Sequence, residues 1–370
     1  MKILAVSYDY PPTIGGIATH VHELYQAIAA TTEGREGHED HEVHILTKPI
    51  KNIAPTNKDG RVHLHSLPRR FLRPFYGYQI NARIDKLCKI IAPDIIHLHG
   101  LLPLHGLTPK PAPIVFTNHS SGYLNRLQKG KNSIKKLDKL FAPIDLLLAP
   151  SEDRLHTISP LRAKTAYIPN GVVVEKFMRN TRNRTRLRNS FGVKEDEPLA
   201  IITSRLEPVK GILDLANATQ YIQHPKLKLL IIGGGKQETE IADVLEKNFY
   251  GRFIMTGEMS HTQIAPYYSA ADFAILPSLM EATSISCLEA MAASLPIVAS
   301  NVGGLPTLVR DGENGILCPP QKPRTLAAAI DNLLASDLAE MGAISHTRTI
   351  TDFTWQKTAS ATLDAYRKIL

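Results

Sequence analysis

The sequence predicts an α/β protein made of two doubly wound parallel-sheet domains that face each other across a cleft. Strand-sized apolar runs alternate with helical patterns along the whole chain, which is typical of βαβ units. The 370 residues, 43% of them hydrophobic, are enough for two cores of ordinary size. Pro169, Asn170 and Gly171 interrupt the pattern between two similar halves. We therefore expect one domain on each side of this break.

The strands are expected where the apolar runs fall. In the first half these are residues 2–9, 42–47, 94–100, 113–119 and 146–151, and in the second half 198–205, 227–235, 252–258, 272–278 and 296–300. Residues 18–30 carry apolar positions every three or four residues, as on a helix. The predicted domains are residues 1–168 and 169–354. A last helix over about 355–370 can pack on either domain, and we place it with the first.

Composition restricts the class of protein. The apolar runs are too short to span a bilayer, and the N-terminus lacks the pattern of a signal peptide. Cys88, Cys287 and Cys318 are scattered, which favours core thiols in a reducing compartment. We expect a cytoplasmic protein. The net charge of +8 favours anionic partners, but zinc-finger spacing and RNA-binding patterns are missing, so nucleic acid is not expected.

Ligands of doubly wound sheets bind at the carboxyl ends of the strands, and polar residues follow several predicted strands. After the first strand, Gly15 and Gly16 permit close backbone approach at a helix start, where free N–H groups favour a phosphate. A simple turn is the alternative. His119 ends the fourth strand and could contact a sugar or its acceptor, or lie on the surface. His97 and His99 have a similar position and weaker support.

The second half opens with ITSRLEPVKG, which places two cations in a loop between a strand and a helix. Arg205 and Lys210 there could neutralise a diphosphate leaving group without a metal. The alternative is a solvated, charged loop. The later glycine run, IIGGGKQETEI, fits neither nucleotide-loop pattern and predicts a tight turn between strand and helix.

The segment PSLMEATSISCLEAM, residues 277–291, holds Glu281 and Glu289 with seven residues between them. Carboxylates only accept hydrogen bonds, so Glu281 could bind sugar hydroxyls and Glu289 the vicinal hydroxyls of a ribose. In the alternative reading, Glu281 is stabilised by the helix dipole and Glu289 forms a capping box with Ser286. The helix is expected to begin near residues 283–286. Its free N–H groups, which could bind a hexose or phosphates, belong to Thr283, Ser284 and Ile285.

Taken in order, these motifs resemble the retaining glycosyltransferases of family 4, which have the two-Rossmann GT-B fold and an E-x7-E motif. The likeness covers nearly the whole chain and is specific as an ordered set. Its pieces are PPTIGGIATHVHEL, IVFTNHS, IPNGV, ITSRLEPVKG, EATSISCLE and EAMAASLPIVASNVGGLPTLVRDGENGILCPP.

The resemblance implies an enzyme that moves a sugar from a nucleotide-diphosphate donor to an acceptor hydroxyl, retains the anomeric configuration and needs no metal or other cofactor. The first domain would then be the acceptor side and the second would bind the donor. The implied contacts are Gly15 and Gly16 near the donor phosphates, His119 on the sugar near its anomeric carbon, Arg205 and Lys210 on the pyrophosphate, Glu281 on the sugar, Glu289 on the ribose, and the backbone near Glu258 and Met259 beside the nucleobase.

The chain departs from the commoner family pattern at Ala282, Thr283 and Ser284, where glycines often stand. Side chains there could narrow the sugar pocket or add hydroxyl contacts, so the donor sugar stays open.

Two basic segments, residues 69–78 and 129–139, lie on the expected acceptor side, the first mixed with aromatic residues. They could form a patch that binds an anionic membrane at the inner face and serves a lipid-linked acceptor. A solvated basic face is the alternative.

Two rival functions fit the same fold. A nucleotide-sugar epimerase would need acid and base groups that remove a carbon-bound proton, and the E-x7-E segment favours transfer instead. A binding protein without turnover would be expected to lack Arg205, Lys210 or Glu281, and all three are present.

Overall fold

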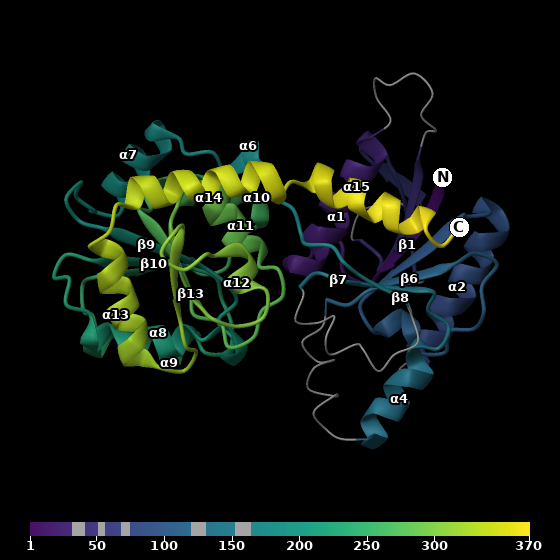
Figure 1. The fold of residues 1–370 in the computed structure, drawn as a ribbon, viewed down its shortest axis with the longest axis horizontal. Helices are drawn as coiled ribbons and strands as arrows, with labels where there is room; N and C mark the ends of the chain where they lie inside the picture. The colour runs from purple at the N-terminus through teal and green to yellow at the C-terminus, as the bar shows by residue number, and fades with distance from the viewer. Residues whose placement is uncertain (32–40, 51–55, 68–74, 120–130, 152–163) are drawn as a thin grey trace. The chain divides into compact units, whose positions relative to one another are not determined.

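A computed structural model describes residues 1–31, 41–50, 56–67, 75–119, 131–151 and 164–370 (Figure 1). The chain divides into two compact units. The first comprises Met1–Gly171 with Trp355–Leu370, and the second Val172–Thr354. Each is a largely parallel sheet covered by helices, so the predicted α/β class with two Rossmann-like domains is confirmed.

The first unit is built on an eight-stranded sheet in the order β3-β4-β2-β1-β5-β6-β7-β8. Only β3 is antiparallel to its described neighbour. The central strands read as continuous apolar runs because helices bury both of their faces. The strands are β1 (Lys2–Ser7), β2 (Glu42–Thr47), β3 (Thr56–Asp59), β4 (Val62–Ser66), β5 (Ile95–His99), β6 (Ile114–Thr117), β7 (Leu146–Ala149) and β8 (Lys164–Tyr167).

The C-terminal helix belongs to the first unit, where it packs along the first helix of the chain (Figure 1). Trp355 and Tyr366 are buried there, and the Thr358 hydroxyl donates to the Pro169 carbonyl at 3.1 Å. The helices that the structure describes in this unit are α1 (Gly16–Ala30), α2 (Tyr76–Ile91), η1 (Leu102–Leu104), α4 (Lys131–Phe141) and α15 (Trp355–Arg367).

The second unit has a six-stranded parallel sheet in the order β11-β10-β9-β12-β13-β14. Counted within the unit this is 3-2-1-4-5-6, the standard dinucleotide-fold order, whose direction reverses between β9 and β12. Ligands of such sheets bind outside the carboxyl ends of the strands at that reversal. The strands are β9 (Leu199–Thr203), β10 (Lys228–Ile232), β11 (Phe253–Met255), β12 (Phe273–Leu276), β13 (Ile297–Ser300) and β14 (Gly315–Cys318).

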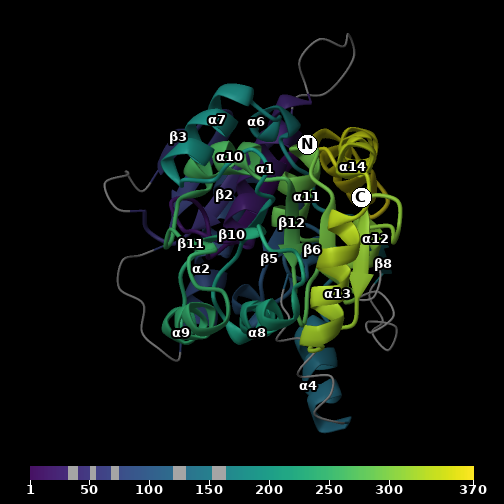
Figure 2. The same ribbon diagram turned by 90° about the vertical axis from the view of Figure 1, so that its left-hand side faces the viewer.

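Helices cover both faces of this second sheet, as Figures 1 and 2 show. One face carries α6 (Val174–Phe177), α7 (Thr181–Ser190), α10 (His261–Ala270), α11 (Ile285–Ala292) and α12 (Leu305–Leu308). The other carries α8 (Ile212–Ala218), α9 (Glu238–Asn248) and α13 (Pro323–Leu334). The helix α14 (Leu338–Asp352) packs on α11, and η2 (Pro208–Lys210) and η3 (Thr219–Tyr221) flank α8.

All ten predicted strands are present, and within the residues that the structure describes four further strands were missed. Three of the four, β3, β8 and β14, are edge strands. Strands β3 (TNKD) and β8 (KTAY) carry polar residues, as short edge strands often do, so their apolar signal is weak. Strand β14 (GILC) is apolar but only four residues long. The fourth, β4, alternates Val62 and Leu64 with two histidines and lies next to an edge.

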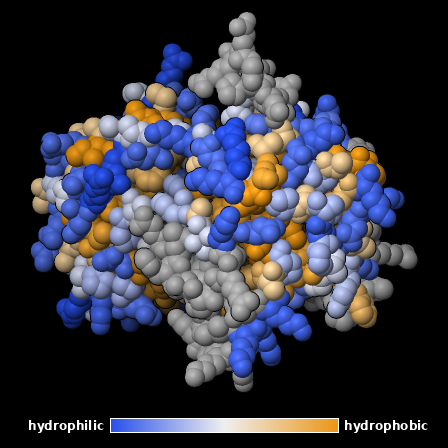
Figure 3. Space-filling model, turned by 45° about the vertical axis from the view of Figure 1, so that its right-hand side comes forward, coloured by the Kyte–Doolittle hydropathy of each residue, from blue (hydrophilic) through white to orange (hydrophobic). Residues whose placement is uncertain are grey.

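The three cysteines are free and buried, as predicted for core thiols. In the part of the chain that the structure describes, no helix combines the length and the hydropathy needed to cross a bilayer. Figure 3 shows hydrophilic and hydrophobic residues interspersed over the face that it draws.

Candidate functional site

The two loops that carry the predicted cations and the first predicted acid, Glu281, are packed directly on each other. Strand β9 leads into residues 204–211 and β12 into residues 277–284, at the reversal of strand order. The Leu279 amide donates to the Val209 carbonyl at 2.9 Å. Gly211 has a φ of 65°, and a Cβ there would lie 2.0 Å from the Pro277 carbonyl oxygen. Only glycine therefore permits this approach of the two loops.

Lys210 and Glu281 meet at this point. The Lys210 Nζ lies 2.5 Å from the Glu281 Oε2, and the Ser278 hydroxyl donates to the same oxygen at 3.3 Å. The two side chains are 21% and 13% exposed, so both are held against the loops yet reachable from solvent. A cation and an acceptor-only group side by side can bind a ligand that carries both an anion and hydroxyl donors.

Arg205 is placed by the three-glycine turn that follows β10. The Leu206 amide donates to the Gly234 carbonyl at 2.9 Å, and a Cβ on Gly233 would lie 1.8 Å from the Ser204 carbonyl oxygen. The glycines thus allow two backbones to touch, as expected for a tight turn between strand and helix. The Arg205 side chain itself is exposed.

Glu289 is a buried carboxylate in α11, with 2% exposure. Its Oε1 lies 2.6 Å from the His261 Nε2, and its Oε2 accepts a hydrogen bond from the Tyr268 hydroxyl at 2.8 Å. The capping-box alternative with Ser286 is wrong. The helix N-cap is Ser284, whose hydroxyl accepts from the Cys287 amide, and Glu289 is the fifth helical residue.

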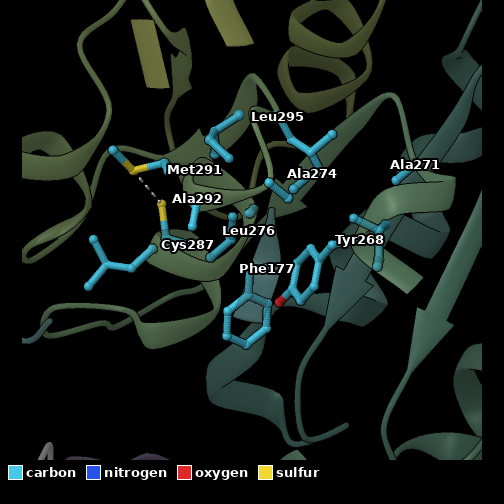
Figure 4. Close-up of a cluster of buried hydrophobic side chains, with 14 of the residues drawn as sticks. Phe177, Tyr268, Ala271, Ala274, Leu276, Cys287, Met291, Ala292 and Leu295 are labelled. Atoms are coloured by element: carbon cyan, nitrogen blue, oxygen red, sulfur yellow. Dashed lines mark hydrogen bonds between the residues drawn. The ribbon is translucent and has the colours of Figure 1, made fainter. Parts of the chain in front are cut away.

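His261 and Tyr268 were missed by the sequence prediction. Burial raises the pKa of Tyr268 well above its ordinary value, so its hydroxyl stays protonated and donates to the carboxylate. Figure 4 shows the Tyr268 ring beside Phe177 in the apolar cluster, which fixes its direction. A signal did exist: Ser260 and Gln263 form a capping box, which puts His261 at the helix start.

The remaining residues predicted to bind a donor lie after β11 and at the start of α11. Thr283 and Ser284 are buried at the start of α11, and the Ser284 hydroxyl is already used as the cap, which limits the extra hydroxyl contact expected there. Ile285 is the first helical residue. Glu258 is exposed after β11, and the half-buried Met259 packs on the core.

In the first unit, Gly15 and Gly16 form the start of α1. Gly15 is the N-cap residue with a φ of 150°, a conformation that favours glycine, and Gly16 is the first helical residue and is exposed. The helix start with its free N–H groups therefore follows the carboxyl end of β1, as predicted.

His119 follows β6 and is half-buried at the end of a chain of buried rings. Its Nε2 lies 3.1 Å from the His99 Nδ1, and the Tyr25 hydroxyl lies 2.8 Å from both the His99 Nε2 and the His97 Nδ1. Burial lowers the pKa of His97 and His99 well below the ordinary value, so both rings are neutral at neutral pH. His119 is thus a partly exposed histidine that contacts a buried ring, rather than a fully solvated one.

Each unit thus brings together a part of the predicted site. The second unit joins Lys210 to Glu281 and holds Glu289 through His261. The first holds Gly15 and Gly16 at a helix start and joins His119 to His99. Of the basic segments, residues 69–74 and 129–130 lie outside the described part of the chain. Lys135, Lys136 and Lys139 of α4 are exposed.

Comparison with known proteins shows which families and relatives the chain resembles. Residues 14–176 match the family model "Glycosyltransferase Family 4", and residues 183–348 match "Glycosyl transferases group 1". The chain is 28% identical to the glycogen synthase of Mycobacterium tuberculosis, over 99% of this chain and 94% of that protein. It is 26% identical to the alpha-monoglucosyldiacylglycerol synthase of Acholeplasma laidlawii, over 85% and 84% of the two chains.

The fold is also that of solved glycosyltransferases. The sucrose-phosphate synthase of Thermosynechococcus elongatus superposes with a TM-score of 0.83 at 23% identity, over 100% of this chain and 98% of that one. Anabaena HepE in complex with UDP and glucose superposes with a TM-score of 0.79 at 17% identity, over the whole of both chains. The two family models and the curated relatives, together with this fold, make the chain a glycosyltransferase of the GT-B superfamily.

Proposed function

We propose that this glycosyltransferase transfers a sugar from a nucleotide-diphosphate sugar to an acceptor hydroxyl, with retention of the anomeric configuration and without a metal ion, in the synthesis of a glycan or glycolipid. The observation that carries the proposal is the contact of Lys210 with Glu281 where the strand order of the second unit reverses. The solved HepE complex, which contains UDP and glucose, supports the donor class.

Lys210 and Arg205 would hold the donor diphosphate and stabilise the charge that develops on it as it leaves. Glu281 would then accept hydrogen bonds from the sugar hydroxyls. When the donor binds, its phosphate replaces Glu281 as the partner of Lys210. The fixed cations supply the electrostatic stabilisation that a metal ion gives in other transferases.

Glu289 would bind the ribose of the donor. Each carboxylate oxygen has two lone pairs. One lone pair of Oε1 is used by the contact with His261, and one lone pair of Oε2 accepts the hydrogen bond from Tyr268. The second lone pair on each oxygen is suited to the two vicinal hydroxyls. Since the carboxylate is 2% exposed, the ribose has to move the half-buried His261 aside as it binds.

In the first unit, Gly15 and Gly16 would let the start of α1 approach the donor phosphates, and His119 would contact the transferred sugar. The buried contact with His99 orients the His119 ring. Backbone near Glu258 and Met259 would border the base.

A panel of nucleotide sugars, incubated with and without acceptor alcohols in the presence of a chelator, tests this function. We expect release of a nucleoside diphosphate and, by NMR, a product with the donor's anomeric configuration. An isomerised donor would indicate an epimerase, and tight binding without any change a binding protein. Loss of turnover in the chelator would contradict metal independence.

We also propose that exposed lysines of α4 attract an anionic membrane surface that presents the acceptor. Lys135, Lys136 and Lys139 lie within about one turn on this helix, whereas its Leu137 and Phe141 are buried in the unit's core. Lysines near an anionic surface contribute about 1 kcal/mol each, and salt screens the effect.

Flotation with anionic and with neutral vesicles measures this attraction. We expect binding to anionic vesicles that weakens as salt is added and falls further when the three lysines are changed to glutamate. The same number of changes on α9, at Lys247 and two other exposed positions, is the control. Equal binding to both kinds of vesicle would contradict the proposal.

A further inference from the structure

Three histidines of the first unit converge from three different elements. His20 comes from α1, His99 from the end of β5, and His119 from the segment after β6. One ring nitrogen of each lies within 4.8 Å of the corresponding nitrogens of the other two. His20 and His99 are buried, and His119 is half-buried. Three imidazoles rarely meet in a protein interior unless they share hydrogen bonds or a ligand.

Hydrogen bonds on the far side of two of the rings orient them toward the common point. The His20 Nδ1 lies 2.7 Å from the Asn170 Oδ1, and because a carbonyl oxygen only accepts, this nitrogen carries the proton. The His20 Nε2 then carries a lone pair, and this atom is buried without a hydrogen-bond partner. The His99 Nε2 lies 2.8 Å from the Tyr25 hydroxyl, which can accept its proton and leave a lone pair on Nδ1.

This arrangement is the one by which proteins prepare histidine ligands for a metal. A ligating imidazole usually donates its other N–H to a carbonyl or a carboxylate, which fixes the tautomer and the ring direction. With Zn–N bonds of about 2.0–2.1 Å, tetrahedral nitrogens lie about 3.3 Å apart. The His99 Nδ1 and His119 Nε2 are already 3.1 Å apart. The His99 ring centroid is 5.4 Å from that of His20 and 5.3 Å from that of His119.

We propose that His20, His99 and His119 form a binding site for a divalent transition metal, with Zn²⁺ as the best-suited ion. Imidazole ligands suit Zn²⁺, Cu²⁺ and Ni²⁺, whereas Mg²⁺ and Ca²⁺ prefer oxygen. Three protein ligands leave a fourth position for water or another ligand. Coordination requires the His20 Nε2 to move toward the ligand nitrogens of His99 and His119 by a rotation of side chains. The metal ion then becomes the partner that the His20 Nε2 lacks.

The site would regulate the enzyme rather than supply its chemistry, and this consequence rests on the proposed function. A metal on the His119 Nε2 fixes that ring against His99 and takes it away from the sugar. Zn²⁺ should therefore inhibit transfer, and a chelator should restore it. Metal binding itself does not depend on what His119 does in transfer.

The test is direct titration of the untagged, chelator-treated full chain with Co²⁺, followed by visible absorption, and with Zn²⁺ in equilibrium dialysis. We expect one equivalent of metal per chain and the absorption bands of a tetrahedral nitrogen site. His20→Gln, His99→Gln and His119→Gln should each weaken binding at least tenfold, since each removes a ligand. Asn170→Ala should weaken binding by about tenfold to a hundredfold, because it removes the group that orients His20.

His105→Gln is the matched control, because His105 is an exposed histidine of the same unit. Circular dichroism shows whether each variant folds. If the variants at the buried positions His20 and His99 do not fold, the metal affinity of His119→Gln, at the half-buried position, decides whether the site exists. Absence of saturable binding, or binding that is the same in wild type and in His119→Gln, overturns the site. Binding without inhibition of transfer leaves the metal site standing and contradicts the sugar contact of His119.

Discussion

Lys210→Ala is expected to lower the turnover number at least about a hundredfold, because one such electrostatic contact to the leaving group is worth around 3 kcal/mol in the transition state. The contact at 2.5 Å with Glu281 places the ammonium in the loop after β9, where the donor phosphates are proposed to bind. Release of nucleoside diphosphate from the preferred donor, measured with saturating donor, reports the change in turnover.

Lys236→Ala is the matched control for this experiment. Lys236 lies in the glycine turn after β10, is 84% exposed and is 3.9 Å from Glu207, so its removal should leave turnover unchanged. Glu281 loses its cationic partner in Lys210→Ala, and thermal unfolding should be compared to show that the loop is intact. A Lys210→Ala enzyme within a few-fold of wild type would contradict the role of this lysine.

Glu289→Gln is expected to weaken donor binding by about tenfold to a hundredfold, because hydrogen bonds to a charged group contribute about 1.5–3 kcal/mol. The amide keeps the size of the side chain and one acceptor oxygen, so the hydrogen bond from Tyr268 can persist. Calorimetry with the nucleoside diphosphate that the panel selects gives the affinity.

Binding of inorganic pyrophosphate distinguishes the proposed role of Glu289 from that of Lys210. It carries no ribose, so Glu289→Gln should bind it as the wild type does, whereas Lys210→Ala should bind both pyrophosphate and nucleotide more weakly. Glu246→Gln, an exposed position on α9, is the control. If Glu289→Gln lowers the unfolding temperature and leaves nucleotide affinity unchanged, Glu289 is structural and the ribose contact is contradicted.

For Glu281 and Glu289, the sequence predicts the position in the chain but not the partners of the side chains. Helix α11 begins where the pattern placed it, and Glu281 precedes it as expected. The role of Glu289 as a helix cap was open in the sequence and is excluded by the structure, since its carboxylate turns to His261 and Tyr268 from α10. A cap is a local feature, but the partner of a buried carboxylate comes from wherever the fold places a donor.

The contacts among the three histidines of the first unit also depend on the fold rather than on local sequence. The position after a strand predicts a site role for His119 and, with less support, for His99, whereas His20 falls in a stretch whose pattern predicts only a helix. Their convergence depends on β1, β5 and β6 lying side by side, with α1 following β1. In the sequence, 79 positions separate His20 from His99 and 20 positions separate His99 from His119, and this spacing resembles no metal motif.

The sequence by itself determined the α/β class, the positions of the central strands and the carboxyl-end loops in which polar residues gather. It could do so because buried strands need apolar residues and ligand loops need glycine and charge, and both are local in the chain. Only the tertiary structure decided which of those side chains touch: Lys210 with Glu281, Glu289 with His261, and His20 with His99 and His119. Those contacts depend on strand order and on close approach of backbones at glycines such as Gly211, which bring together residues that are far apart in the sequence.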